Sequence, residues 1–169
     1  TAAEAAEHFK NGDTVGLSGF TAPGTPKFIP EAIAAKAERE HAEGRPFKIN
    51  LLTGASTSDH VDGALSRANA LNFRAPYQNV PDLRKRINSH DCHYNDRHLS
   101  EMAQEVRYGF YGKVDWAIIE AADITPDGEV ILGTGVGNIP TYAKLADKIF
   151  IELNEALPKA LYGMHDIYL

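Results

Sequence analysis

Three short segments rich in glycine, serine, threonine and asparagine hold the groups best suited to chemistry in this sequence. They are residues 18–21 (SGFT), residues 53–57 (TGAST) and residues 135–138 (GVGN). Glycine lets main-chain N–H groups approach a ligand closely, and hydroxyl and amide side chains add further donors. Donors of this kind bind a carboxylate or the oxyanion that develops during acyl transfer. The alternative for each segment is an ordinary turn or helix cap that binds no ligand.

The first segment lies between an expected strand and an expected helix. Residues 14–18 are β-leaning, and residues 19–24 form a loop rich in glycine and proline. Thr25 and Pro26 are typical of a helix N-cap and first turn, and apolar residues recur four apart after them. A helix that begins there directs its N–H groups and the positive end of its dipole at the loop. This arrangement suits an anion or a polarised carbonyl.

This loop does not match a nucleotide-binding motif. Gly19 and Gly24 have the spacing of a Walker A loop, but Thr25 and Pro26 stand where that motif has lysine and serine or threonine. The dinucleotide pattern G-x-G-x-x-G is also absent from this loop. We therefore expect a ligand smaller than a triphosphate.

Two further strand, loop and helix units follow the first. Residues 47–52 form a strand before TGAST, residues 114–121 read as a strand buried on both faces, and a hairpin at residues 124–131 leads into GVGN. This alternation predicts one α/β domain, an open and mainly parallel sheet with helices on both faces. The three loops would share its carboxyl edge, which favours a small-molecule site. Glu120, at the end of the buried strand, is the candidate base there.

The histidine-rich segment at residues 89–100 (SHDCHYNDRHLS) invites a metal or cysteine interpretation. Its spacing matches no zinc pattern, so we expect no metal. Cys92 and His93 are adjacent, and adjacent residues of a strand point to opposite faces, so they could not act as nucleophile and base. We expect a strand at residues 93–94, a loop, and a helix capped by Ser100.

Composition excludes several classes of protein. The chain has 169 residues, with 43% hydrophobic and 24% charged residues, as in one globular domain. A net charge of -6 without a basic run argues against nucleic acid, and no apolar run reaches membrane-spanning length. The single cysteine excludes an internal disulfide and fits a reducing, cytoplasmic compartment. The chain begins with Thr1 rather than methionine, and we expect it to be part of a longer protein.

Most of the chain, from residue 12 to residue 167, resembles the N-terminal part of the acetyl-CoA hydrolase/transferase family, of which succinyl-CoA:acetate CoA-transferase is the best-known type. The segments that carry the resemblance are, in order, GDTVGLSGFTAPGTPKFIPEAI, LLTGAST, RINSHDCHYNDRHLS, YGKVDWAIIEAADITPDGEV, GVGN, KIFIELNE and MHDI. The resemblance implies a class I CoA-transferase (NagB/RpiA-like) fold, with residues 1–169 as the N-terminal domain. It also implies coenzyme A as a substrate, a C-terminal catalytic domain outside this chain, and a homodimer.

The family's chemistry implies which half of a site this chain would supply. A glutamate of the C-terminal domain attacks an acyl-CoA and becomes a glutamyl-CoA thioester, and no segment here matches it. The resemblance therefore leaves this chain no catalytic residue and gives it the acyl and carboxylate pocket, with Ser56 matching a pocket serine of relatives. Asn79 stands where some relatives have threonine, which leaves the acyl preference open. The implied substrate-binding residues are Ser18, Gly19, Phe20, Thr21, Gly54, Ala55, Ser56, Thr57, Gly135, Val136, Gly137 and Asn138.

Two other classes of function remain open from the sequence. One is a binding module for small acids or acyl-CoA that has no catalysis. The other is an enzyme related to the sugar-phosphate isomerases, which share the broad fold and would need Glu120 as a base.

Overall fold

The computed structural model describes residues 1–17, 19–56 and 58–164, and for Ser56 only the main chain. The expected strand end at Ser18 and most of the MHDI segment, residues 165–167, lie outside the described residues. No described helix has the length and apolar character needed to cross a membrane. The helices are α1 (Ala2–Glu7), α2 (Phe28–Ala42), α3 (Ala64–Arg67), α4 (Pro81–Asn88), α5 (Leu99–Arg107) and α6 (Ile139–Leu145), with short turns η1 (Asp59–Gly63) and η2 (Lys159–Leu161). The strands are β1 (Thr14–Leu17), β2 (Phe20–Thr21), β3 (Ile49–Leu52), β4 (Ala55–Ser56), β5 (Leu71–Ala75), β6 (His93–Tyr94), β7 (Trp116–Ile124), β8 (Val130–Leu132) and β9 (Lys148–Leu153).

A seven-stranded sheet forms the centre of the molecule. Its strands follow the order β6-β5-β3-β1-β7-β8, and β9 also pairs with β7. Every pair in it is parallel except β7 with β8, which form the expected hairpin. A separate pair, β2 with β4, is also parallel. The prediction of an open, mainly parallel sheet is confirmed.

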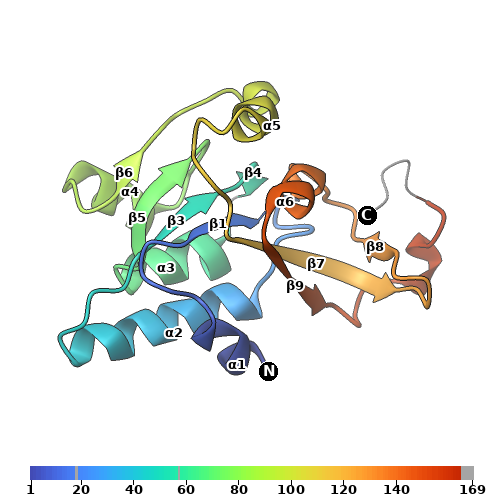
Figure 1. Ribbon diagram of the computed structural model, residues 1–169, viewed down its shortest axis with the longest axis horizontal. Coiled ribbons are helices and arrows are strands. Elements are labelled where there is room, and N and C mark those ends of the chain that lie inside the picture. Colours follow the sequence, from blue (N-terminus) through green and yellow to red (C-terminus); the bar gives the residue numbers. More distant parts are fainter. Residues whose placement is uncertain (18, 57, 165–169) are drawn as a thin grey trace.

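Helices cover both faces of this sheet, with α1, α2 and α3 on one face and α5 and α6 on the other (Figure 1). Successive residues of a strand point to opposite faces, so a strand covered on both sides is apolar throughout. In β3, Leu51 belongs to the core cluster that includes α2, whereas Leu52 packs with residues of α5 and α6. Ile118 and Ala117 of β7 divide between the same two clusters. The apolar runs in the sequence therefore reflect a central sheet with two cores.

The carboxyl ends of β1 and β8 meet beside β7. Ala121 of β7 pairs with Leu153 of β9 on one side and with Leu132 of β8 on the other. Ile118 of β7 also pairs with β9 on one side, and on the other side, where β8 lies, it pairs with Leu17 of β1. Strands β1 and β8 therefore lie on the same side of β7 and run towards each other. The loops that follow them leave the sheet at one place.

Two helices begin at residues other than those that the sequence pattern indicated. Lys27 is the N-cap residue of α2, so the expected cap at Thr25 is wrong. Thr25 is instead buried in the preceding loop, where its hydroxyl donates to the main-chain oxygen of Thr21 at 2.9 Å. Helix α5 has His98 as its N-cap, so Ser100 lies in the first turn and does not cap it. At α2, the buried contact of Thr25 with the preceding loop, and not its local capping preference, decides where the helix begins.

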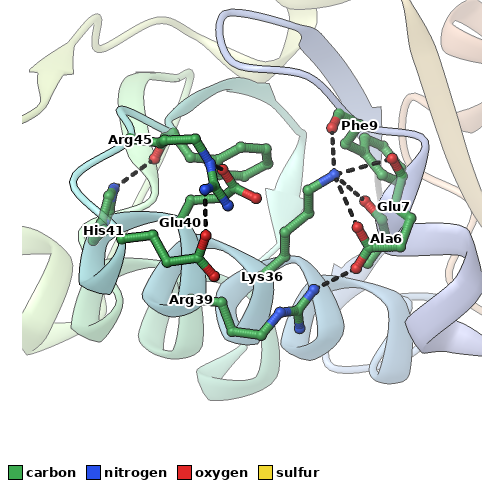
Figure 2. Close-up of polar contacts among 10 residues, drawn as sticks. Ala6, Glu7, Phe9, Lys36, Arg39, Glu40, His41 and Arg45 are labelled. Atoms are coloured by element: carbon green, nitrogen blue, oxygen red, sulfur yellow. Dashed lines mark hydrogen bonds and ion pairs between the residues drawn. The ribbon is translucent and has the colours of Figure 1, made fainter.

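Helix α1 is fastened to α2 by one buried ammonium group (Figure 2). The Nζ of Lys36 donates to the main-chain oxygens of Ala6, Glu7 and Phe9 at 3.3, 3.0 and 2.9 Å. Ala6 and Glu7 lie in the last turn of α1, where main-chain carbonyls commonly accept hydrogen bonds from outside the helix. The contact also gives the buried charge polar partners, as a buried ammonium group requires.

Candidate functional site

The first two glycine-containing loops are joined by main-chain pairing. Strand β2 in the SGFT loop runs parallel to β4 in the TGAST loop, with Phe20 opposite Ala55 and Thr21 opposite Ser56. These short strands lie beyond the carboxyl ends of β1 and β3. Thr21 has a left-handed φ of 56°, which a β-branched residue adopts rarely. The surrounding contacts thus hold this loop in a strained conformation of the kind found at functional sites.

The third loop packs directly against the first. A β-carbon on Gly24 would lie 1.7 Å from the main-chain oxygen of Gly135, and one on Gly135 would lie 2.1 Å from that of Pro23. Both distances are far below a van der Waals contact. Glycine at both positions therefore permits the main chain of residues 23–24, which follow SGFT in the first loop, to touch that of the GVGN loop.

Tyr142 of α6 connects the third loop to the second. Its ring lies over Gly16 of β1, where a β-carbon would come within 2.5 Å of it. Its hydroxyl donates to the main-chain oxygen of Thr53, which also accepts a hydrogen bond from the Asn138 amide at 3.2 Å. Burial raises the pKa of Tyr142, so the phenol stays protonated and remains a donor. All three loops are thereby fixed to one another at the carboxyl edge of the sheet.

The structure thus brings together most of the site residues indicated by the sequence. Phe20, Thr21 and Gly137 are exposed there, whereas Gly135 is buried in the contact between loops. Ser18 and Thr57 lie outside the described residues, as does the side chain of Ser56. The residues that the structure places at these loops are Gly19, Phe20, Thr21, Gly54, Ala55, the main chain of Ser56, Gly135, Val136, Gly137 and Asn138.

The start of α2 is not open to a ligand. The carboxylate of Glu152, in β9, accepts hydrogen bonds from the main-chain N–H groups of Lys27, Phe28 and Ile29 at 2.7, 3.1 and 3.0 Å. A carboxylate at this position satisfies the free N–H groups of the helix and interacts favourably with its dipole. The expected use of this helix terminus for a substrate anion is therefore wrong, because the protein's own glutamate occupies it.

Glu120 lies beside Glu152 and binds side chains from the start of α2 and from the end of β9. It is 2% exposed, faces Glu152 across the β7–β9 pair and forms an ion pair with the ammonium of Lys27. Lys27 also donates to the main-chain oxygen of Thr25 at 3.0 Å, and Asn154 donates to Glu120 at 3.1 Å. A carboxylate held in this way supports the loop before α2. The geometry favours this supporting role over that of a base.

One hydroxyl of the second loop region caps a helical turn. Ser58 accepts a hydrogen bond from the N–H of His60 at 3.2 Å and thereby caps η1. Thr53 donates its hydroxyl to the main-chain oxygen of Gly54 at 3.1 Å. The helical segment that follows ends at Arg67. The capping interpretation is therefore correct for Ser58.

All 169 residues match the protein-family model described as "Acetyl-CoA hydrolase/transferase N-terminal domain". The chain belongs to this family. The resemblance noted from the sequence motifs is thereby confirmed.

Curated relatives of this N-terminal domain are much longer than the chain. A propanoyl-CoA:succinate CoA transferase of Escherichia coli is 51% identical over 91% of this chain, which spans 31% of that relative. A succinyl-CoA:acetate CoA-transferase of Clostridium kluyveri is 46% identical over 99% of the chain and 31% of its own length. An acetyl-CoA hydrolase of Schizosaccharomyces pombe is 40% identical, over 95% of the chain and 32% of its length. The chain thus spans about a third of the relatives it matches.

Solved structures confirm the fold of the acetyl-CoA hydrolase/transferase N-terminal domain. RipA from Yersinia pestis superposes with a TM-score of 0.71 at 17% identity, over 94% of this chain and 37% of that chain. Glutaconate coenzyme A-transferase from Acidaminococcus fermentans gives a TM-score of 0.65 at 17% identity, over 90% and 67% of the two chains. The expected CoA-transferase type of α/β fold is therefore correct.

The histidine-rich segment of this family domain takes the strand and helix that the sequence indicated. His93 and Tyr94 form β6, and the thiol of Cys92 is buried and donates to the main-chain oxygen of His93 at 3.4 Å. Burial raises the pKa of the Cys92 thiol to about 11, which disfavours the reactive thiolate. Among the described residues, no three histidine, cysteine, aspartate or glutamate side chains are grouped so that they could hold a metal ion.

Sequence reasoning missed a buried ion pair behind the second loop. Arg74 of β5 is 0% exposed and binds Asp62, which is 1% exposed. Its Nε and Nη2 donate to the two carboxylate oxygens at 2.9 and 3.0 Å. The one available signal was an arginine within an otherwise apolar strand. Its partner Asp62 lies 12 residues away, and no local pattern in the sequence pairs the two residues.

Proposed function

We propose that this chain is the acyl- and carboxylate-binding N-terminal domain of a CoA-transferase or acetyl-CoA hydrolase. Its substrates would be an acyl-CoA and a small carboxylate such as acetate or succinate. The complete protein would be a cytoplasmic homodimer of two-domain chains. No residue of this chain is assigned as the nucleophile.

The observation that carries this proposal is the convergence of the three glycine-containing loops at one edge of the sheet. The loops are held by β2–β4 pairing, by the contact of Gly24 with Gly135 and by two hydrogen bonds to Thr53. Fixed N–H and O–H donors stabilise a carboxylate or oxyanion because they need no rearrangement as charge develops. This is the contribution that a transferase requires from the side of the site without the nucleophile.

The chemistry divides between this domain and the remainder of the protein. A glutamate of the remainder attacks the thioester carbonyl, the C–S bond breaks and CoA leaves as a thiolate, which produces an acyl-glutamyl anhydride. The thiolate then attacks the glutamyl carbonyl, releases the acyl group as a carboxylate and leaves a glutamyl-CoA thioester. The acceptor carboxylate, or water in a hydrolase, completes the cycle. The loops of this domain hold the acyl and carboxylate groups during these steps.

The test is intact-mass spectrometry after incubation with acyl-CoA. The complete protein should gain the mass of CoA through a glutamyl thioester that borohydride or hydroxylamine removes. The chain of residues 1–169 should fold, since it has its own cores, but should gain no such mass. A CoA adduct on the isolated chain at Glu120 would overturn this division of roles. A natural gene that ends at Leu169 would instead favour a binding module without catalysis.

A further inference from the structure

The outer edge of β9 has no partner strand among the residues that the structure describes. The main-chain N–H groups of Lys148 and Asn154 donate towards β7 at 3.3 and 2.8 Å. In a parallel pair, the residues that bond to a given neighbour alternate along the strand. The N–H and C=O groups of Ile149, Ile151 and Leu153 therefore point away from β7, at the open edge.

Apolar side chains along this edge are also left uncovered. Ile149 and Leu153 are 45% and 53% exposed. Beside β9, α1 and the start of α2 border a groove of about 610 Å³, whose lining includes Ile29, Phe150 and the 66%-exposed Phe28. Native proteins rarely leave an apolar strand edge open, because it would pair with other chains. A further element is therefore expected to cover β9.

We propose that the outer edge of β9 receives an additional β-strand from the part of the complete protein outside these 169 residues. That strand would pair with the open N–H and C=O groups, as in β-augmentation. Its apolar side chains would cover Ile149 and Leu153 on one face and enter the groove beside Phe28 on the other. The inference rests on the proposed function only in taking the chain as about a third of a longer protein, as in its relatives.

A tethered strand fits this surface better than a second copy of the chain. The edge is only six residues long, and its exposed apolar side chains are few. A stable interface between separate proteins buries roughly 800 Å² on each partner. Association of separate chains also loses translational and rotational freedom, whereas a covalently linked segment is present at a high effective concentration. A small apolar edge is therefore sufficient for a segment of the same polypeptide.

Residue-resolved hydrogen exchange tests the proposal in the isolated chain and in the complete protein. In the isolated chain, the amides of Phe150 and Glu152 should be protected by β7, whereas those of Ile149, Ile151 and Leu153 should exchange rapidly. In the complete protein, these outer amides should slow by roughly 100-fold, because exchange then requires the added strand to open. Outer amides that exchange equally fast in both proteins would overturn the proposal. Outer amides whose protection in the isolated chain grows with its concentration would show that a second copy is the occupant.

A pair of substitutions at one position gives an independent test. Ile149→Pro removes an outward N–H that β7 does not use, and Ile149→Ala shortens the same side chain but keeps the N–H. The two variants of the isolated chain should have similar thermal midpoints. In the complete protein, the thermal midpoint of the proline variant should lie a few degrees below that of the alanine variant, because one hydrogen bond to the added strand is lost. Equal midpoints of the two complete variants would contradict the proposal.

Neither measurement depends on catalysis. A complete protein that protects the β9 edge but forms no glutamyl-CoA would refute the proposed function alone. An active protein with an unprotected edge would refute the added strand alone.

Discussion

Gly24 and Gly135 lie so close together that a β-carbon on Gly24 would come within 1.7 Å of the Gly135 main-chain oxygen. The two residues are 111 positions apart in the sequence and belong to the first and third loops of the candidate site. Their contact follows from the meeting of β1 and β8 beside β7. The position of one loop therefore determines the position of the other, and substitutions that add volume here should separate them.

Gly24→Ala should destabilise the domain more than the same change at Gly44. Both glycines have a left-handed φ, of 74° and 75°, so both substitutions incur the same backbone strain of roughly 1 kcal/mol. Gly44 has open space around it, whereas a methyl group on Gly24 collides with the main chain of Gly135. We expect Gly24→Ala to cost at least about 2 kcal/mol more than Gly44→Ala in denaturant unfolding. Equal costs would show that the loops separate easily.

Tyr142→Phe should weaken the link between the second and third loops without disturbing the core. The ring over Gly16 remains, and the hydrogen bond to the Thr53 oxygen is lost. Because Asn138 still donates to that oxygen, we expect a loss of about 0.5–1.5 kcal/mol, or a few degrees in the thermal midpoint. Tyr108→Phe is the control, since Tyr108 is 65% exposed and should tolerate the change. A midpoint as high as that of the control would exclude Tyr142 as a link.

Local patterns were sufficient to predict the sheet and the loops, because they depend on short-range chemistry. Apolar runs marked the strands with two buried faces, and Gly128, with a φ of 90°, lies in the turn of the predicted hairpin. Three glycine-containing loops at one edge followed from the alternation of strands and helices. This alternation alone therefore predicts that the TGAST and GVGN loops lie at the same edge of the sheet.

The partners of charged side chains could not be predicted in the same way. Glu152 reaches the start of α2 from 125 residues away, and nothing near Lys27 in the sequence indicates it. The same is true of Glu120. Its position at the end of a strand made it a candidate base, but its ion pair with Lys27 shows that it supports the loop before α2. Local propensity favoured Thr25 as the helix cap, but the distant carboxylate of Glu152 determines where the N–H groups are satisfied. Such contacts depend on the register of strands that are remote in sequence.

Asp62→Ala should be one of the most destabilising single substitutions in the domain. It would leave the guanidinium of Arg74 buried without its carboxylate, and breaking a buried pair in this way costs roughly 3–5 kcal/mol. The matched control is Asp59→Ala, which removes the carboxylate that Arg67 binds at the surface. Arg67 lowers the pKa of Asp59 by hydrogen bonding, but an exposed pair contributes only about 0–1 kcal/mol. Unfolding in urea should separate the two variants clearly, and similar midpoints would contradict the assigned burial.

Cys92 should make the stability of the domain fall at alkaline pH. Burial raises the pKa of its thiol to about 11, whereas an exposed thiol titrates near pH 8.5. Because the folded state holds this proton more tightly, the contribution is complete below about pH 8.5 and is lost as the pH rises towards 11. The free energy of unfolding should fall by up to about 1.4 kcal/mol per pH unit in this window. Denaturant unfolding between pH 7 and 10 should show a shallower decline for Cys92→Ala, and parallel profiles would refute the assignment.

Ser56→Ala and Ser58→Ala should separate a substrate contact from a structural cap. Ser58 caps η1, so its loss should cost about 1 kcal/mol of stability and leave kcat/KM unchanged. We propose Ser56 as the residue that contacts the substrate, and its main chain pairs with Thr21 in the SGFT loop. Loss of its hydroxyl should lower kcat/KM of the complete protein by roughly 5- to 150-fold, as expected for a lost hydrogen bond of about 1–3 kcal/mol, with little change in stability.

The division of that loss between kcat and KM identifies the step at which the Ser56 hydroxyl acts. A donor to the bound acceptor would raise KM for the carboxylate, whereas a donor to the developing oxyanion would lower kcat. Both constants should therefore be measured at several acceptor concentrations for the wild type and the two variants. Wild-type kinetics in Ser56→Ala would remove this residue from the pocket. A loss of activity in Ser58→Ala that exceeds the one in Ser56→Ala would assign the substrate contact to the wrong hydroxyl.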